Sequence, residues 1–235
     1  MIKQIKSFIT SFVYLFYPRI CHGCGGDLVT GEKFICLSCR QLLEPTDYSS
    51  KKENRIYNNM VARIPMEEAT SFYYFTKGGV IQNLLHDLKY KGKRDVGVYL
   101  GELFGQHLLQ FDRYRKVDVI IPVPLHDKKF KKRGFNQSER LGKGLSHEMT
   151  KPLLTNVLVR SQFTATQTNK SRVERWENVE AAFDIKNENM LKGKHILLVD
   201  DVMTTGATLE ACARKLMMIE GVTISLATLA YTDEL

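Results

Sequence analysis

The segment that most constrains the fold runs from residue 195 to residue 229. A short apolar run, His195–Val199, is followed by a polar stretch, Asp200–Ala207, and then by an amphipathic helical pattern, Thr208–Glu220. Gly221 then indicates the end of the helix, and a second apolar run, Thr223–Leu229, follows it. Strands that alternate with helices in this way predict a mostly parallel sheet.

The preceding residues extend the same alternation. Short runs of aromatic or β-branched residues predict strands at Ser71–Phe75 and Val117–Val123. Leucines at helical spacing predict helices over Val80–Lys89 and Val96–Phe111, and a third helix over Asn136–Met149. The predicted fold class is therefore α/β, with a mostly parallel sheet flanked by helices.

The polar stretch after residue 199 offers the groups that a ligand would need. Asp200 and Asp201 follow a buried strand, at the edge where α/β sheets usually bind ligands. The loop then enters a helix, whose N-terminal backbone N–H groups favour an anion. We expect the loop to bind phosphate and the acids to take sugar hydroxyls or a metal carried by the ligand. The loop residues are Thr204, Thr205, Gly206, Ala207 and Thr208.

This loop has three other interpretations. A Walker-type nucleotide site is excluded, because no position fits G-x-x-x-x-G-K-[ST]. A response-regulator receiver is disfavoured, because its acids open a domain of about 100 residues or more, whereas only 34 residues follow Asp201. A purely structural turn remains the open alternative.

Four cysteines form two C-x2-C pairs, Cys21 with Cys24 and Cys36 with Cys39, separated by eleven residues. Each pair predicts a knuckle that turns both thiolates toward one point, and four thiolates in a tetrahedron suit Zn2+. Four protein ligands leave no open coordination position, so the predicted zinc is structural. Two disulfides, or His22 as a ligand in place of one cysteine, are the alternatives.

The N-terminal residues predict a small module that precedes the sheet. Apolar residues at helical spacing from Ile2 to Phe16 predict an amphipathic helix, which packs on the protein or lies on a membrane surface. No run has the ~20 apolar residues of a membrane span, and no signal-peptide cleavage site follows, so we expect a cytoplasmic protein. Polar residues from Pro45 to Asn59 predict a linker. The predicted domains are residues 1–50, the helix with a zinc ribbon, and residues 60–235.

Positive charge is concentrated in one place. The chain has 34 Lys and Arg against 26 Asp and Glu, a net charge of +8, and five of these cations lie in Lys128–Arg133. The run could hold a phosphate, form a solvated face or contact a nucleic-acid backbone. His126, just before it, is a candidate acid or base, and Asn136, just after it, is predicted to cap the next helix.

These features together resemble a known family. The apolar strand, Asp-Asp and Thr-Gly-x-Thr match the motif with which type I phosphoribosyltransferases bind phosphoribosyl pyrophosphate (PRPP). The cysteine pairs, the stretch Ile121–Gln137 and the stretch Thr166–Asn178 extend the resemblance to the ComF family of competence proteins over nearly the whole chain.

The resemblance implies roles for particular residues. The segment Ser161–Asn178 would be a flexible catalytic loop, and Mg2+ would accompany PRPP. The implied catalytic residues are Asp200, Asp201, Arg172 and Arg175, and the residues implied to bind PRPP beside the loop are Pro124, Leu125, His126 and Arg133.

Two functions from different classes follow from the resemblance. The first is an enzyme, a phosphoribosyltransferase that moves ribose 5-phosphate from Mg2+-PRPP to an unknown acceptor. The second is a non-catalytic factor for DNA uptake in natural transformation. Its basic run and zinc module would contact single-stranded DNA or a partner helicase.

Overall fold

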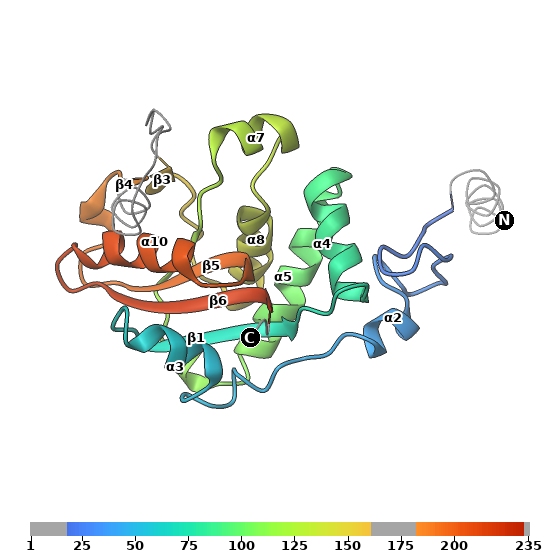
Figure 1. Ribbon diagram of the computed structural model, residues 1–235, viewed down its shortest axis with the longest axis horizontal. Coiled ribbons are helices and arrows are strands. Elements are labelled where there is room, and N and C mark those ends of the chain that lie inside the picture. The colour runs from blue at the N-terminus through green and yellow to red at the C-terminus, as the bar shows by residue number, and fades with distance from the viewer. Residues whose placement is uncertain (1–17, 161–181, 233–235) are drawn as a thin grey trace, which may run out of the picture.

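The computed structural model describes residues 18–160 and 182–232, and Figure 1 shows how its helices and strands are arranged. In chain order the elements are α2 (Leu37–Gln41), α3 (Arg55–Val61), β1 (Glu68–Tyr74), α4 (Val80–Tyr90), α5 (Arg94–Leu108), α6 (Asp112–Arg115), β2 (Val119–Pro122), α7 (Asp127–Arg133), α8 (Gln137–Met149), β3 (Leu158–Arg160), β4 (Phe183–Ile185), the 3-10 turn η1 (Glu188–Met190), β5 (His195–Met203), α10 (Ala207–Met217) and β6 (Thr223–Tyr231).

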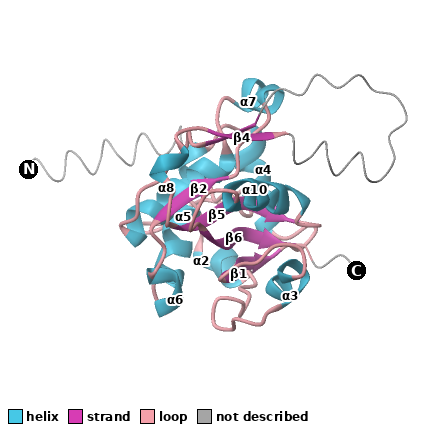
Figure 2. Cartoon of the chain, turned by 90° about the vertical axis from the view of Figure 1, so that its left-hand side faces the viewer, coloured by secondary structure: helices cyan, strands magenta, loops and turns pink. Residues whose placement is uncertain are grey.

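The central sheet is parallel throughout, in the order β1–β6–β5–β2. Figure 2 shows the strands side by side in this spatial order, with α5 and α8 on one side of the sheet and α3 on the other. Residues of α4, α5 and α8 share a core with one face of the sheet, and residues of α3 and α10 share a core with the other. The predicted α/β class, a parallel sheet flanked by helices, is confirmed.

Strand β5 shows why the sheet is covered on both faces. Ile196 and Leu198 belong to the core beneath α3 and α10, whereas Leu197 and Val199 belong to the core beneath α4, α5 and α8. Successive side chains of a strand point to opposite faces, and all four of these are fully buried. The apolar run is thus a strand buried on both sides, as its composition predicts.

The acid pair lies within the strand and not in the loop that follows it. Strand β5 continues to Met203 because its neighbour β6 continues to Tyr231, and these two residues are register partners. The sequence predicted that the strand would end at Val199. The register also pairs Asp200 with Thr228, so the backbone of the acid pair is held by the sheet.

Helix α10 is shorter than the sequence predicted. It ends at Met217, and a turn follows in which Ile219 N–H donates to Leu216 O before Gly221 adopts φ 72°. Cys212 is fully buried on this helix.

The polar segment expected to be a linker is packed against the sheet. Tyr48 and Ser49 are buried, and the Asn54 amide donates to the carbonyl oxygens of Tyr48 (3.2 Å) and Ala69 (2.7 Å). The Asn54 side chain also caps α3. Thr46 and Asn54 are buried and bond to backbone groups, whereas Lys51, Lys52 and Glu53 between them are exposed. The division into residues 1–50 and 60–235 remains a prediction.

Two features were missed by the sequence analysis. The basic run forms α7, which has no buried residue and stands above the edge of the sheet in Figure 1. Strands β3 and β4 pair antiparallel, but three residues each are too few to give a periodic pattern. Asn136 does cap α8, as predicted, by accepting from Ser138 N–H.

Several predictions lie outside the described residues. They are the amphipathic helix before residue 18 and the whole segment 161–178, with its Arg172 and Arg175. Among the helices that are described, none has the length and apolar character needed to cross a bilayer. The cytoplasmic location remains a prediction.

Candidate functional site

The loop between β5 and α10 surrounds a small hollow. Its lining comprises Asp200, the end of β5 and the first residues of α10, and its volume is about 40 Å³. Gly206 adopts φ 77° as the N-cap of α10, a conformation that favours glycine. Each of the loop residues predicted to bind phosphate lines the hollow: Thr204, Thr205, Gly206, Ala207 and Thr208. The loop therefore leaves room at the start of the helix.

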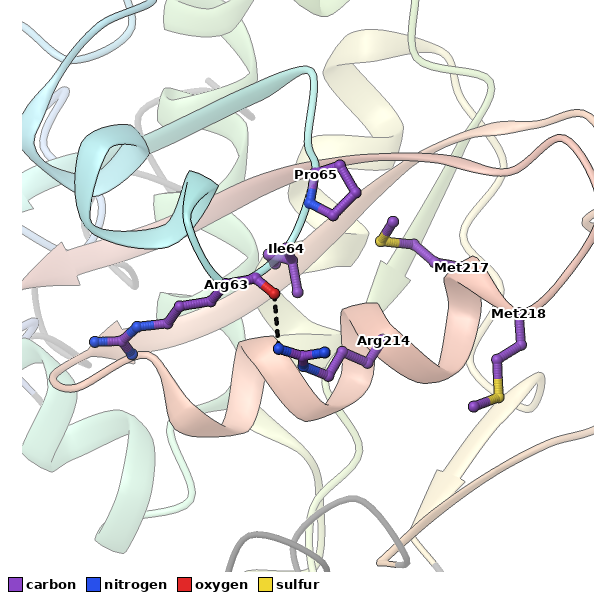
Figure 3. Close-up of a pocket in the computed structure, with 6 residues that line it drawn as sticks. All are labelled: Arg63, Ile64, Pro65, Arg214, Met217 and Met218. Atoms are coloured by element: carbon purple, nitrogen blue, oxygen red, sulfur yellow. Dashed lines mark hydrogen bonds between the residues drawn. The ribbon is translucent and has the colours of Figure 1, made fainter.

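Residues that follow α3 support this loop from outside. The Arg63 guanidinium donates to the carbonyl oxygen of Thr205 at 2.9 Å, and it lies 3.7 Å from the buried carboxylate of Glu210 on α10. Arg214 donates to the carbonyl oxygen of Arg63 at 2.7 Å and to Glu210 at 3.1 Å. Figure 3 shows Arg63 and Arg214 joined in this way beside a hollow of about 230 Å³. Both guanidinium groups contact Glu210 and donate to a backbone carbonyl oxygen, so the arginines fix the loop.

The two acids have different surroundings. One oxygen of Asp200 accepts from Ser138 Oγ and from the backbone N–H of Asp201, each at 2.8 Å. Burial, and then the charge of Asp201, raise the pKa of Asp200 to about 7, although these hydrogen bonds oppose the rise. Near neutral pH this carboxyl group can therefore either hold or release a proton.

Asp201 has a cationic partner that no sequence pattern predicts. Lys89 Nζ lies 2.8 Å from Asp201 Oδ2, and both side chains are mostly buried, at 23% and 15% exposed. Lys89 is the second-last residue of α4, and nothing local in its sequence indicates that α4 ends beside β5. Only the packing of α4 over the sheet brings these residues together.

A second, larger hollow adjoins the first. It has a volume of about 150 Å³ and shares Asp200 and Thr208 with the phosphate-loop hollow. Cationic side chains from three separate elements, α4, α7 and β3, line it: Lys89, Lys129, Arg133 and Arg160. The other polar residues of its lining are Asn136, Gln137, Ser138, Asp200, Asp201 and Thr208. The two hollows together form one site with cations at one end, acids in the middle and a helix N-terminus at the other end.

The remaining predicted residues divide into two groups. Pro124, Leu125 and Arg133 line the larger hollow. His126 is not among the lining residues, and its Nδ1 accepts from Lys128 N–H, so it caps α7. Arg160, which was not predicted, ends β3 immediately before the segment that lies outside the described residues.

Arg133 is held by two neighbours. Its guanidinium donates to Gln137 Oε1 at 2.9 Å and lies over the ring of Tyr90 at 5.4 Å from the centroid. These contacts fix the end of α7 beside the end of α4. The basic run therefore contributes to the lining of the hollow with two of its residues, Lys129 and Arg133, and exposes the others.

The four cysteines of the N-terminal pairs form a second candidate site. Their sulfur atoms lie within 4.8 Å of one another and none is in a disulfide, so the disulfide alternative is not supported. Cys21 Sγ accepts from the N–H groups of Gly23 (3.3 Å) and Cys36 (3.2 Å). A Cβ at Gly23 would lie 2.7 Å from Cys39 Sγ, so glycine permits the close approach. The cluster fits a tetrahedral cation.

The pKa values of the cysteine thiols also favour a bound cation. Burial opposes ionisation of Cys21, but hydrogen bonds, above all from the backbone of Cys36, lower its pKa to about 7. Burial and then the neighbouring sulfurs raise the pKa of Cys39 well above the usual range. Four thiolates this close together need a cation to ionise fully. His22 is not part of the cluster, because its Nδ1 lies 2.8 Å from Asp87 Oδ2.

The chain is similar to several known proteins. Residues 134–234 match the phosphoribosyl transferase domain family. The chain is 32% identical over 152 residues to the DNA utilization protein YhgH of Salmonella typhi, an alignment that covers 63% of this chain and 66% of that protein. It is 26% identical over 210 residues to competence protein F of Haemophilus influenzae, covering 86% and 92% of the two chains. It is 37% identical over 99 residues to competence protein ComFC of Bacillus subtilis, covering 42% and 38%.

Solved structures give more distant similarities. An adenine phosphoribosyltransferase from Thermoanaerobacter pseudethanolicus aligns with 83% of this chain and 86% of its own, at 17% identity and a TM-score of 0.39. The allosteric regulatory enzyme of purine biosynthesis aligns with 60% of this chain and 29% of its own, at 18% identity and a TM-score of 0.42.

Proposed function

We propose that this chain, a ComF-like protein with a phosphoribosyltransferase fold, binds Mg2+-PRPP across the two adjoining hollows. The observation that supports this most strongly is that the hollows share Asp200 and Thr208. A ligand that spans them has an anion at each end and a polyol between, which is the chemistry of PRPP.

Each part of the ligand has a matching part of the site. The 5-phosphate lies in the hollow at the start of α10, where backbone N–H groups and threonine hydroxyls can donate. The ribose hydroxyls lie at Asp200 and Asp201. The pyrophosphate lies in the larger hollow, where Lys89, Arg133 and Arg160 supply positive charge.

The same arrangement can assist transfer of the ribose 5-phosphate. In that reaction the bond from the sugar carbon C1 to pyrophosphate breaks, pyrophosphate leaves with the electron pair, and an acceptor nucleophile bonds to C1. The cations of the larger hollow stabilise the departing charge, and the acid pair faces the positive charge that develops on the sugar. Mg2+, brought by PRPP, would neutralise part of the pyrophosphate charge.

Calorimetry on the full chain tests the proposal. Wild type should bind Mg2+-PRPP, and Asp200→Asn with Asp201→Asn should abolish measurable heat. Asp112→Asn, which changes an acid that is 87% exposed on α6, is the matched control and should bind as wild type does. Absence of heat with folded wild-type protein would refute the proposal. Release of pyrophosphate across a panel of acceptors distinguishes an enzyme from a protein that only binds.

We also propose that the cysteine cluster holds one structural Zn2+. The support is the set of four thiol ligands with N–H donors to sulfur, and no position is left for a substrate. Elemental analysis should find about one zinc per chain. A zinc content near zero in folded protein would exclude the proposal.

As a second candidate function we propose that the surface around α7 binds single-stranded DNA. Phe130 on α7 is 47% exposed, Tyr90 at the end of α4 is 58% exposed, and the cations of α7 surround Phe130. Exposed aromatic rings among cations are typical of single-strand binding. Three relatives are named for competence or DNA utilization. A partner helicase remains a prediction of the resemblance.

Salt dependence tests the DNA proposal. Lys128, Lys131 and Lys132 do not line the hollow, so changing all three to Gln should leave PRPP binding intact. The change should reduce the slope of log affinity against log salt for a labelled oligonucleotide by about 2. An unchanged slope, or no binding at all by wild type, would contradict the proposal.

A further inference from the structure

In Figure 1, α4 lies between the blue segment that carries the cysteine pairs and the helices α5 and α8. The module, residues 20–43, contacts α4 through two polar bonds. His22 Nδ1 lies 2.8 Å from Asp87 Oδ2, and Asn83 Nδ2 donates to the carbonyl oxygen of Gly23 at 2.7 Å. Asn83 and Asp87 are four residues apart, so they lie on one face of the helix.

The contact is buried and specific. The side chains of His22 and Asp87 are each only 9% exposed, and the other oxygen of Asp87 is 2.8 Å from Lys91 Nζ. Cys21 and Cys39 belong to the same apolar cluster as Ile81 and Leu84 of α4. Polar pairing and apolar packing therefore fix the position of α4 relative to the module.

The other side of the same helix serves the acid pair. Lys89 follows Asp87 by two residues, about 200° further around the helix. Its ammonium group lies 2.8 Å from Asp201 and lines the larger hollow. The last two turns of α4 thus contact the cysteine module on one face and Asp201 on another.

We propose that Asp87 is a positioning residue for the acid-pair site. Anchored to the cysteine module through His22, it sets the rotation and height of the last turn of α4 and so places Lys89 against Asp201. Loss of the module, or of its anchor on α4, then weakens anion binding in a hollow that the module does not line. This inference rests on the proposed PRPP site for its binding test alone.

A double-mutant cycle on the zinc-loaded full chain tests the proposal. Asp87→Asn should weaken Mg2+-PRPP binding about tenfold while zinc content stays unchanged. Simple electrostatics predicts the opposite, because removing a negative charge near the site should favour an anion. Lys89→Gln should weaken binding as well, and the double variant should bind no more weakly than Lys89→Gln alone.

Lys91→Gln is the matched control, because it removes the exposed partner of Asp87 and leaves the contact with His22 in place. It should change affinity less than twofold. Wild-type affinity in Asp87→Asn, or additive effects in the double variant, would overturn the proposal.

Hydrogen exchange gives a readout that needs no ligand. Amides of residues 86–91 should exchange faster in Asp87→Asn than in wild type, and Lys91→Gln should resemble wild type. If wild type fails to bind Mg2+-PRPP, the proposed function fails while this measurement still decides the role of Asp87. Unchanged exchange in Asp87→Asn would overturn that role whether or not PRPP binds.

Discussion

At the scale of single residues, the acid pair is the least conventional part of the site. Two adjacent carboxyl groups at the end of a buried strand repel each other, and only Asp201 has a cation within ion-pair distance among the described residues. Asp200 instead accepts two hydrogen bonds and keeps a raised pKa. Because the proton is bound more tightly in the folded state, this carboxyl opposes folding when it is ionised.

The stability of the protein should therefore depend on Asp200 in a particular direction. A carboxyl group whose folded pKa is about 7, above its usual value of about 3.9, favours the folded state at low pH. That contribution is lost as the pH rises from about 4 to 7. Asp200→Asn should be more stable than wild type at pH 8, by on the order of 2 kcal/mol, and nearly equal to it at pH 4.

Urea denaturation at both pH values measures the difference, with Asp112→Asn as the exposed control. A gain that is the same at pH 4 and pH 8 would show that Asp200 does not titrate in this range.

Gly206 has a left-handed backbone and little room for a side chain. Its φ is 77°, and a Cβ there would lie 2.6 Å from Met60 Sδ and 2.9 Å from Met203 Cε. Both methionines are buried, so their side chains cannot move without displacing core neighbours. The loop is thus shaped both by its own backbone and by α3 beneath it.

Gly206→Ala should cost stability and weaken ligand binding. The left-handed backbone alone costs about 1–2 kcal/mol, and the contacts with the methionines should add about 1 kcal/mol. Gly78→Ala is the control, because Gly78 has φ 76° and nothing within 4 Å of its added Cβ. Denaturation curves should show the smaller loss in the control, and calorimetry should show weaker PRPP binding in Gly206→Ala alone. Equal losses of stability would mean that the methionines give way.

At the scale of elements, α5 and α8 approach each other through glycines. A Cβ on Gly144 would lie 2.1 Å from Val98 O and 2.5 Å from Glu102 N, and one on Gly101 would lie 2.1 Å from Leu141 O. These neighbours are backbone atoms, which cannot rotate away. The close approach holds α8 against α5. The first turn of α8 carries Ser138, which donates to Asp200.

Two alanine substitutions on α8 should therefore differ sharply. Gly144→Ala should destabilise the protein by about 3 kcal/mol or more, because the helices must separate. In Gly142→Ala the added Cβ would lie 2.8 Å from Leu153 Cδ1, at the end of a flexible side chain. The change from glycine to alanine also favours the helix by about 1 kcal/mol. Its net effect should be close to zero. Urea denaturation measures both, and similar losses would show that helix separation is not the cause.

At the scale of the whole molecule, the cysteine module is joined to the sheet domain. Cys21, Ile35, Cys39 and Leu43 share one apolar cluster with residues of β1, α4 and α5. The module therefore contributes its buried surface to a core that the sheet also uses.

Removal of the proposed zinc should affect the entire fold. A chelator should lower the melting temperature of one cooperative transition and should not create a second one, because both parts share a core. Differential scanning calorimetry measures this, with chelator-treated protein reloaded with Zn2+ as the control. A separate low-temperature transition, with the main one unmoved, would show two independent domains and would support the predicted boundary.

Most strands and helices of the sheet domain, and the chemistry of its local motifs, can be predicted from the sequence. The strand at His195–Val199, the loop of Thr204–Thr208 and the spacing of the cysteine pairs depend on residues close together in the chain. Periodicity and side-chain type report such features directly. For the same reason the parallel sheet with helices on both faces could be predicted before any coordinates.

The tertiary structure alone decided which distant residues meet. Arg63 and Thr205 are 142 positions apart, and Lys89 reaches Asp201 only because α4 packs over the sheet. Neither contact leaves a local pattern, since each depends on how a helix is placed across the strands. The polar residues around Asn54 suggested an exposed linker because composition does not show whether a polar group is bonded to water or to backbone. The folded chain distinguishes a buried polar group from a solvated one, because it shows which groups hydrogen-bond to backbone.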